Sequence, residues 1–106
     1  MREHSKLFIV LLAFCSLCGA ASAQSYSVFP NSSNRSLYDN ELSVLTCQDL
    51  WVARNEIYDR RGYCFKTRRG QAFFSNQGCW TNAAQLSRLE NQNVARIKAW
   101  ERRFGC

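Results

Sequence analysis

The fold is decided by one stretch of the chain, residues 46–62, which reads TCQDLWVARNEIYDRRG. Thr46 and Asp49 have the spacing of a capping box, in which side chains bind the free amides at the start of a helix. Apolar side chains follow at helical intervals, at Leu50, Ala53 and Ile57. Gly62 is typical of the position just after a helix. The stretch therefore predicts an amphipathic helix over about residues 46–61.

A second long helix is predicted over about residues 88–104. Ser87 and Glu90 again have capping-box spacing, and Gly105 stands where the helix would end. Its apolar side chains are Val94, Ile97 and Trp100. Thr67 is placed to cap a short helix between the two, although Gly70 disfavours it. Since no stretch alternates like a strand, the expected class is all-α.

The first 23 residues have the features of an export signal. Arg2 and Lys6 precede an apolar run, residues 7–18, that is too short to span a bilayer. Ala21-Ser22-Ala23 fits the pattern that a signal peptidase cleaves. Cys15 and Cys18 do not form a lipoprotein site, because large residues precede both of them. We expect a chain without a transmembrane segment, exported to the periplasm or beyond.

The remaining residues are predicted to form one small domain. Residues 24–41 are rich in Ser and Asn and contain the only proline, Pro30, so we expect a flexible lead-in there. The folded domain is expected over residues 42–106. The whole chain has a formal net charge of +6 at pH 7, and loss of Arg2, Glu3 and Lys6 with the leader lowers it by one unit.

Four cysteines remain after the leader: Cys47, Cys64, Cys79 and Cys106. An even number in a small exported domain indicates disulfides rather than a zinc site, which prefers closely spaced ligand pairs. Cys47 and Cys64 flank the first helix and would lie ~25 Å apart at 1.5 Å per residue. A disulfide tolerates only ~4.4–6.8 Å between Cα atoms, so this pairing is excluded. Antiparallel packing of the two long helices favours Cys47–Cys106 with Cys64–Cys79 over the other remaining connectivity.

Catalytic chemistry is poorly represented in the predicted domain. The only histidine, His4, lies in the leader, and bridged cysteines are not nucleophiles. We therefore expect a chain that is not an enzyme and that holds no metal or cofactor. Glu56 and Asp59 resemble a glycosidase pair, but carboxylates at this helical spacing are better explained as a solvated face, with Arg60 as the ion-pair partner of Glu56.

Charged residues fall on the apolar arcs of both long helices. Arg54 and Arg61 lie on the arc of the first helix, and Glu90 and Glu101 lie on that of the second. An unpaired charge on a buried face is strongly destabilising. In the antiparallel register, Arg54 comes near Glu101 and Arg61 comes opposite Glu90. We expect two ion pairs between the helices; the alternative is that the arginines line an anion site.

The string Tyr58-Asp59-Arg60-Arg61-Gly62, after Arg54-Asn55-Glu56-Ile57, resembles the signature of the YARHG domain, a bacterial module of the cell exterior. The resemblance extends from Leu42 to Glu101. It is supported by Leu45, Phe65, Phe73-Phe74, Trp80, Leu86-Ser87, Glu90, Asn93, Ile97 and Lys98. Asp59 replaces an alanine of the family and Arg61 its histidine, so no role of that histidine transfers. The resemblance implies a small envelope or secreted domain without an established activity.

The densest group of cations lies between residues 60 and 69 and comprises Arg60, Arg61, Lys66, Arg68 and Arg69. We predict that they bind anionic envelope polymer, which means peptidoglycan, polysaccharide or lipid head groups; the alternative is an ordinary solvated face. Trp51 and Trp80 are expected in the core, with stacking on sugar rings as their alternative role. The other hypotheses are a secreted protein-interaction factor, such as an inhibitor or toxin, and a carboxylate-dependent hydrolase. Specific nucleic-acid binding is not expected of an exported chain.

Overall fold

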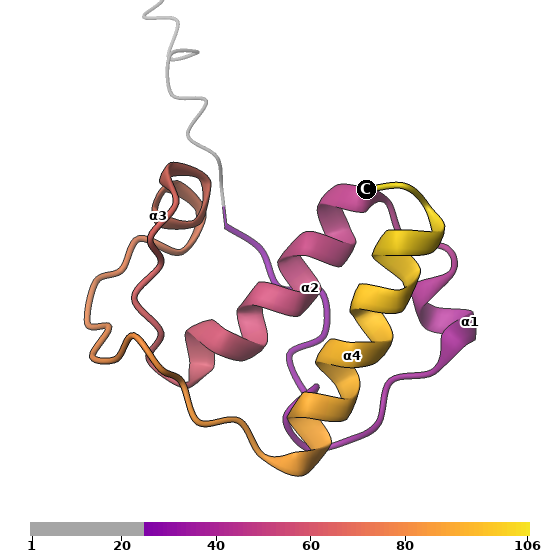
Figure 1. The fold of residues 1–106 in the computed structure, drawn as a ribbon, viewed down its shortest axis with the longest axis horizontal. Coiled ribbons are helices and arrows are strands. Elements are labelled where there is room, and N and C mark those ends of the chain that lie inside the picture. The colour runs from indigo at the N-terminus through magenta and orange to yellow at the C-terminus, as the bar shows by residue number, and fades with distance from the viewer. Residues whose placement is uncertain (1–24) are drawn as a thin grey trace, which may run out of the picture.

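The computed structural model describes residues 25–106, which form four helices (Figure 1). These are α1 (Asp39–Leu42), α2 (Cys47–Arg60), α3 (Arg68–Phe74) and α4 (Arg88–Arg103). The described part of the chain has no strand, only an isolated bridge between Tyr63 and Thr81. The all-α prediction is confirmed. The predicted export signal lies outside the described residues, and among the residues described no helix has the length and apolar character needed to cross a membrane.

The ends of α2 follow from its sequence. The side chain of Thr46 accepts a hydrogen bond from the amide of Asp49, which is the Thr46 half of the predicted capping box, while Asp49 accepts a hydrogen bond from the hydroxyl of Tyr26 instead. At the other end Gly62 takes a φ of 79°, a left-handed conformation that a glycine adopts without strain. α4 begins with the complete capping box of Ser87 and Glu90.

α2 and α4 pack side by side and antiparallel to form the core (Figure 1). Leu50, Ala53 and Ile57 of α2 are fully buried, and Val94 and Ile97 of α4 lie in the same cluster. The bridge Cys47–Cys106 joins the start of α2 to the end of α4, with 5.5 Å between the Cα atoms. Cys64–Cys79 closes the loop around α3, with 5.1 Å between the Cα atoms. Both predicted disulfides are confirmed.

The expectation of a flexible lead-in is wrong for residues 25–41. Leu37 is fully buried in the core, and Asn93 of α4 binds the segment on both sides of Arg35. The amide of Leu37 donates to Oδ1 of Asn93 at 3.0 Å, and Nδ2 of Asn93 donates to the carbonyls of Ser32 and Arg35 at 2.8 Å. A polar segment without regular structure is thus held because buried side chains of the helices satisfy its backbone.

α3 rests on α2 through aromatic side chains. Trp51 meets the rings of Phe73 and Phe74 at 5.7 and 5.8 Å, and Phe65 stacks on Phe74 at 4.6 Å. Gly70, which disfavours this helix by its intrinsic propensity, is required by the packing. A Cβ atom at Gly70 would lie 2.8 Å from the ring of Phe65.

Candidate anion-binding surface

Two ion pairs cross the interface between α2 and α4. Nε and Nη2 of Arg54 donate to the two carboxylate oxygens of Glu101 at 2.6 and 3.0 Å. Nε of Arg61 donates to both oxygens of Glu90 at 2.9 and 3.1 Å. The structure thus brings together the pairs that the helical register indicates. The guanidinium of Arg54 is occupied by Glu101, which leaves the arginine little capacity for a bound anion.

Glu90 is the most fully enclosed of these charges. Its side chain is 0% exposed, whereas that of Arg61 is 44% exposed. It accepts further hydrogen bonds from the hydroxyl of Ser33 at 2.6 Å and from the amide of Ser87 at 2.8 Å. Burial raises the pKa of Glu90, but the hydrogen bonds from Ser33, Ser87 and Arg61 outweigh it and hold the pKa below its ordinary value. Glu90 is therefore a structural anion that joins α4, the end of α2 and the segment before α1.

Four of the seven acids within residues 25–106 are paired or buried inside the domain, whereas most of the cations are not. Glu90 and Glu101 pair with arginines of α2, Glu41 pairs with Arg35, and Glu56 is buried. Within residues 25–106, nine cations are exposed and take part in no ion pair. They are Arg60, Lys66, Arg68, Arg69, Arg88, Arg96, Lys98, Arg102 and Arg103. The surface is therefore more cationic than the composition alone suggests.

The structure divides the cationic group between residues 60 and 69 into two parts. Arg61 is held by Glu90, and Arg60 donates to the hydroxyls of Ser32 and Ser33, so both fix the fold. The other three cations, Lys66, Arg68 and Arg69, lie exposed at the start of α3. We call these three residues the α3 patch.

Arg69 of the α3 patch is fixed by its neighbours. Its guanidinium lies 3.8 Å from the ring centroid of Trp51, a cation–π contact, and it donates to the side-chain oxygen of Gln48 at 2.5 Å. Lys66 and Arg68 make no side-chain hydrogen bond or ion pair within the described residues. These two are the cations of the predicted group that remain available to a ligand.

A second cationic surface, which the sequence reasoning missed, lies on α4. At about 100° per residue, all five cations of the helix fall within an arc of about 160° that includes neither glutamate. We call this surface the α4 face; it consists of Arg88, Arg96, Lys98, Arg102 and Arg103. The residues between them are small or uncharged: Asn91, Gln92, Ala95 and Ala99. The signal was present in the sequence, because the arc opposite Glu90 and Glu101 contains every cation of the helix.

The two tryptophans occupy different environments. Trp51 is half-buried between α2 and α3, against the rings of Phe73 and Phe74 and outside the main core cluster. Trp80 is 72% exposed, so the expectation of a core position is wrong for it. It lies across the backbone of Gly62, where the absence of a Cβ atom makes room for the indole.

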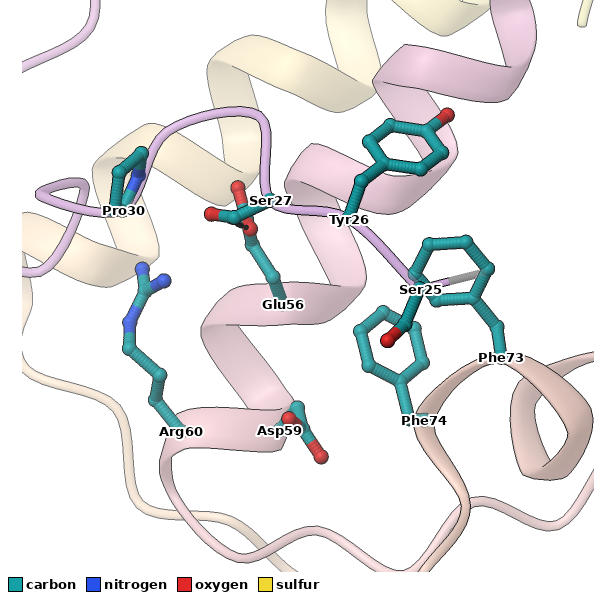
Figure 2. A pocket seen from close by; sticks show the side chains of 9 residues that line it. All are labelled: Ser25, Tyr26, Ser27, Pro30, Glu56, Asp59, Arg60, Phe73 and Phe74. Carbon is teal, nitrogen blue, oxygen red and sulfur yellow. Dashed lines mark hydrogen bonds between the residues drawn. The ribbon is translucent and has the colours of Figure 1, made fainter. Parts of the chain in front are cut away.

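A hollow of about 460 Å³ lies where the N-terminal segment crosses α2 and α3 (Figure 2). Glu56, Asp59 and Arg60 of α2 line one side, and Phe73 and Phe74 of α3 line the other. Glu56 is buried and accepts hydrogen bonds from Ser27 Oγ at 2.6 Å and from the backbone amides of Val28 and Phe29. The expectation of a solvated Glu56 paired with Arg60 is wrong.

Asp59 is the second carboxylate of the hollow. Burial raises its pKa, the nearby charge of Glu56 raises it further, and Arg60 opposes both. The oxygens of Glu56 are engaged by the backbone amides of residues 28 and 29, so Glu56 holds the N-terminal segment, whereas the side chain of Asp59 makes no hydrogen bond within the described residues. The described residues contain no cluster of three side chains with the chemistry of a metal site.

Comparison with known proteins places these features in a family. The model of the YARHG domain matches residues 25–102. The chain belongs to the YARHG domain family. The match begins ahead of Leu42, in agreement with the packing of the N-terminal segment, and the family is one of small extracellular or periplasmic domains. No curated protein and no solved structure shows significant similarity to the chain.

Proposed function

We propose that this YARHG domain is a non-catalytic module, exported from a bacterial cell, that binds an anionic polymer of the cell envelope. One observation carries the proposal: the domain pairs or buries most of its acids internally and exposes nine unpaired cations. A surface of this kind attracts polyanions through long-range electrostatics, without a deep pocket. The polymers of an envelope that fit this chemistry carry carboxylates, as peptidoglycan does, or phosphates, as many polysaccharides and lipid head groups do.

The α3 patch is the first candidate for the contact. Lys66 and Arg68 have no partner within the described residues, so binding an anion disrupts no internal interaction of theirs. Arg69 is already oriented by Trp51 and Gln48, which lowers the entropic cost of contacting a ligand. Arg60 and Arg61 are engaged by Ser32, Ser33 and Glu90 as parts of the fold and are not offered as ligand contacts.

A secreted protein-interaction factor is the second candidate function. The exposed indole of Trp80 favours it, since a large aromatic side chain on a rigid surface is typical of the residues that dominate protein interfaces. Against a carboxylate-dependent hydrolase stands the engagement of both Glu56 oxygens by the N-terminal segment.

The experiment compares binding of the exported protein to purified peptidoglycan sacculi over a series of salt concentrations. We expect affinity to fall steeply with salt and the Lys66→Ser/Arg68→Ser variant to bind more weakly, with a salt slope lower by about one unit for each cation removed from the interface. The variant Lys66→Arg/Arg68→Lys retains both charges and serves as the matched control. Salt-independent binding of a single envelope protein, abolished by Trp80→Ala, would favour the interaction factor instead.

A further inference from the structure

The two cationic surfaces lie on opposite sides of α2. Figure 1 shows α3 on one side of this helix and α4 on the other. The contacts agree, because α2 meets α4 through Leu50 and meets α3 through Trp51 and Gln48. At 100° per residue, Trp51 and Gln48 lie about 100° and 160° around the helix from Leu50. A single ligand strand lying flat on one surface therefore does not reach the other.

The α4 face has the shape of a binding platform for an extended anion. The helix has 16 residues and is ~24 Å long at 1.5 Å per residue. Ala95 and Ala99 lie between the cations, so a strand can approach the helix closely along its centre. The large apolar side chains Val94 and Ile97 are buried against α2, so the face offers charge rather than apolar side chains that would insert into a lipid layer.

A hollow of about 340 Å³ continues the α4 face toward α2. Lys98 and Arg102 line it together with Arg54, Glu101 and Cys106. Arg54 is engaged by Glu101, so Lys98 and Arg102 supply the free donors for one anionic group seated there. The nearby bridge Cys47–Cys106 ties the end of α4 to α2, which holds this end of the face in place.

We propose that the domain cross-links two polyanion strands, one bound on the α4 face and one on the α3 patch. The proposal rests on the proposed function, and it adds that each molecule is bivalent. Because α2 separates the two surfaces and the bridge Cys47–Cys106 ties α4 to α2, the bound strands are kept apart by the width of the domain. A module of this kind cross-links two anionic polymer chains rather than binding along a single chain.

The test uses long-chain polyphosphate as the probe. Biotinylated polyphosphate is fixed on beads, loaded with the exported protein at low salt and washed, and fluorescent polyphosphate is then added. We expect the protein to bind the first strand and capture the second. In the α4 variant Arg96→Gln/Lys98→Gln/Arg102→Gln and in the α3 variant Lys66→Gln/Arg68→Gln, first-strand binding should persist, while capture of the second strand falls by about tenfold or more, as expected when two sites act as a linked pair.

Matched controls separate surface position from total charge. The variant Arg96→Lys/Lys98→Arg/Arg102→Lys keeps every charge and should capture the second strand as the unaltered protein does. First-strand binding without second-strand capture would overturn the bridge and leave the proposed function intact. Absence of first-strand binding would overturn the bridge, and would overturn the proposed function as well if the protein also fails to bind sacculi. Undiminished capture by both single-surface variants would indicate that paired protein molecules, rather than two faces of one molecule, join the strands. Clustering of anionic vesicles with no capture of polyphosphate would assign the surface to lipid and also overturn the proposal.

Discussion

The indole of Trp80 lies on the backbone of Gly62, the glycine that closes the family motif. A Cβ atom at position 62 would lie 2.2 Å from Cε2 of Trp80, and the backbone there has a φ of 79°. The amides of Trp80 and Thr81 both donate to the carbonyl of Gly62, at 2.8 and 3.1 Å. This glycine therefore ends α2 and also anchors the loop that carries Cys79.

The variant Gly62→Ala should be less stable than Gly78→Ala. Both glycines are left-handed, with φ values of 79° and 81°, so each alanine costs about 1–2 kcal/mol of backbone strain. Only at position 62 does the new methyl group also meet Trp80, because nothing lies within 4 Å of a Cβ atom at position 78. Urea unfolding followed by circular dichroism measures the difference. Equal destabilisation of the two variants would show that the indole contact does not contribute.

Stability should fall in acid partly through Glu90. The pKa of Glu90 in the folded protein lies below its ordinary value, so the ionised carboxylate stabilises the fold. This contribution is complete when the pH is above the pKa of Glu90 in the unfolded chain, and it is lost as the pH falls through the pKa of Glu90 in the folded protein. The variant Glu90→Gln should be less stable at neutral pH, and its free energy of unfolding should change less between neutral and acid pH. Urea titrations at a series of pH values measure this.

Glu41 provides the matched control for that experiment. Hydrogen bonding to Arg35 lowers the pKa of Glu41 as well, but Glu41 is only half-buried whereas Glu90 is enclosed. The variant Glu41→Gln should therefore change the pH profile in the same direction by a smaller amount. A Glu90→Gln profile parallel to that of the unaltered protein would contradict the assignment of Glu90 as a structural anion.

The sequence predicts the helical frame because the signals for it are local. Thr46 and Ser87 identify the helix starts, and the distance between Cys47 and Cys64 along a helix excludes one disulfide pairing without knowledge of the fold. The packing of residues 25–38 was missed because its cause is not local. It depends on Asn93 and Glu56, polar side chains that bind backbone groups more than 25 residues away in the sequence.

In the candidate site, too, the sequence indicates the local feature and misses what depends on contacts between distant residues. Counting cations along the chain identifies a dense group between residues 60 and 69, but it does not show that Arg60 and Arg61 are engaged within the fold. The cations of the α4 face are spread over 16 residues, so counting cations that are close together in the sequence does not detect them as a group. It becomes visible only when the inward direction of Glu90 and Glu101 defines which arc of the helix faces outward.

Replacing Asp59 with alanine should stabilise the domain at neutral pH. Burial and the charge of Glu56 raise the pKa of Asp59, so its ionised form is less favourable in the folded protein than in the unfolded chain. The stability gained by Asp59→Ala should therefore be larger at neutral pH than in acid, where Asp59 is protonated. Thermal unfolding at both pH values checks this. A destabilised variant at neutral pH would indicate that Asp59 makes a favourable contact in the hollow.

The ion pair between Arg54 and Glu101 offers the sharpest test of the α2–α4 interface. The two side chains are 24% and 14% exposed and form two hydrogen bonds, so removing either one leaves the other charge poorly solvated. We expect Arg54→Ala and Glu101→Ala to destabilise comparably, and the double variant to be destabilised by less than their sum, with a coupling of about 0.5–3 kcal/mol. The more exposed pair Arg35–Glu41 should show weaker coupling in the same cycle, since water screens it better. Purely additive destabilisation, together with failure of Arg54→Ala to bind polymer, would show instead that Arg54 serves a ligand.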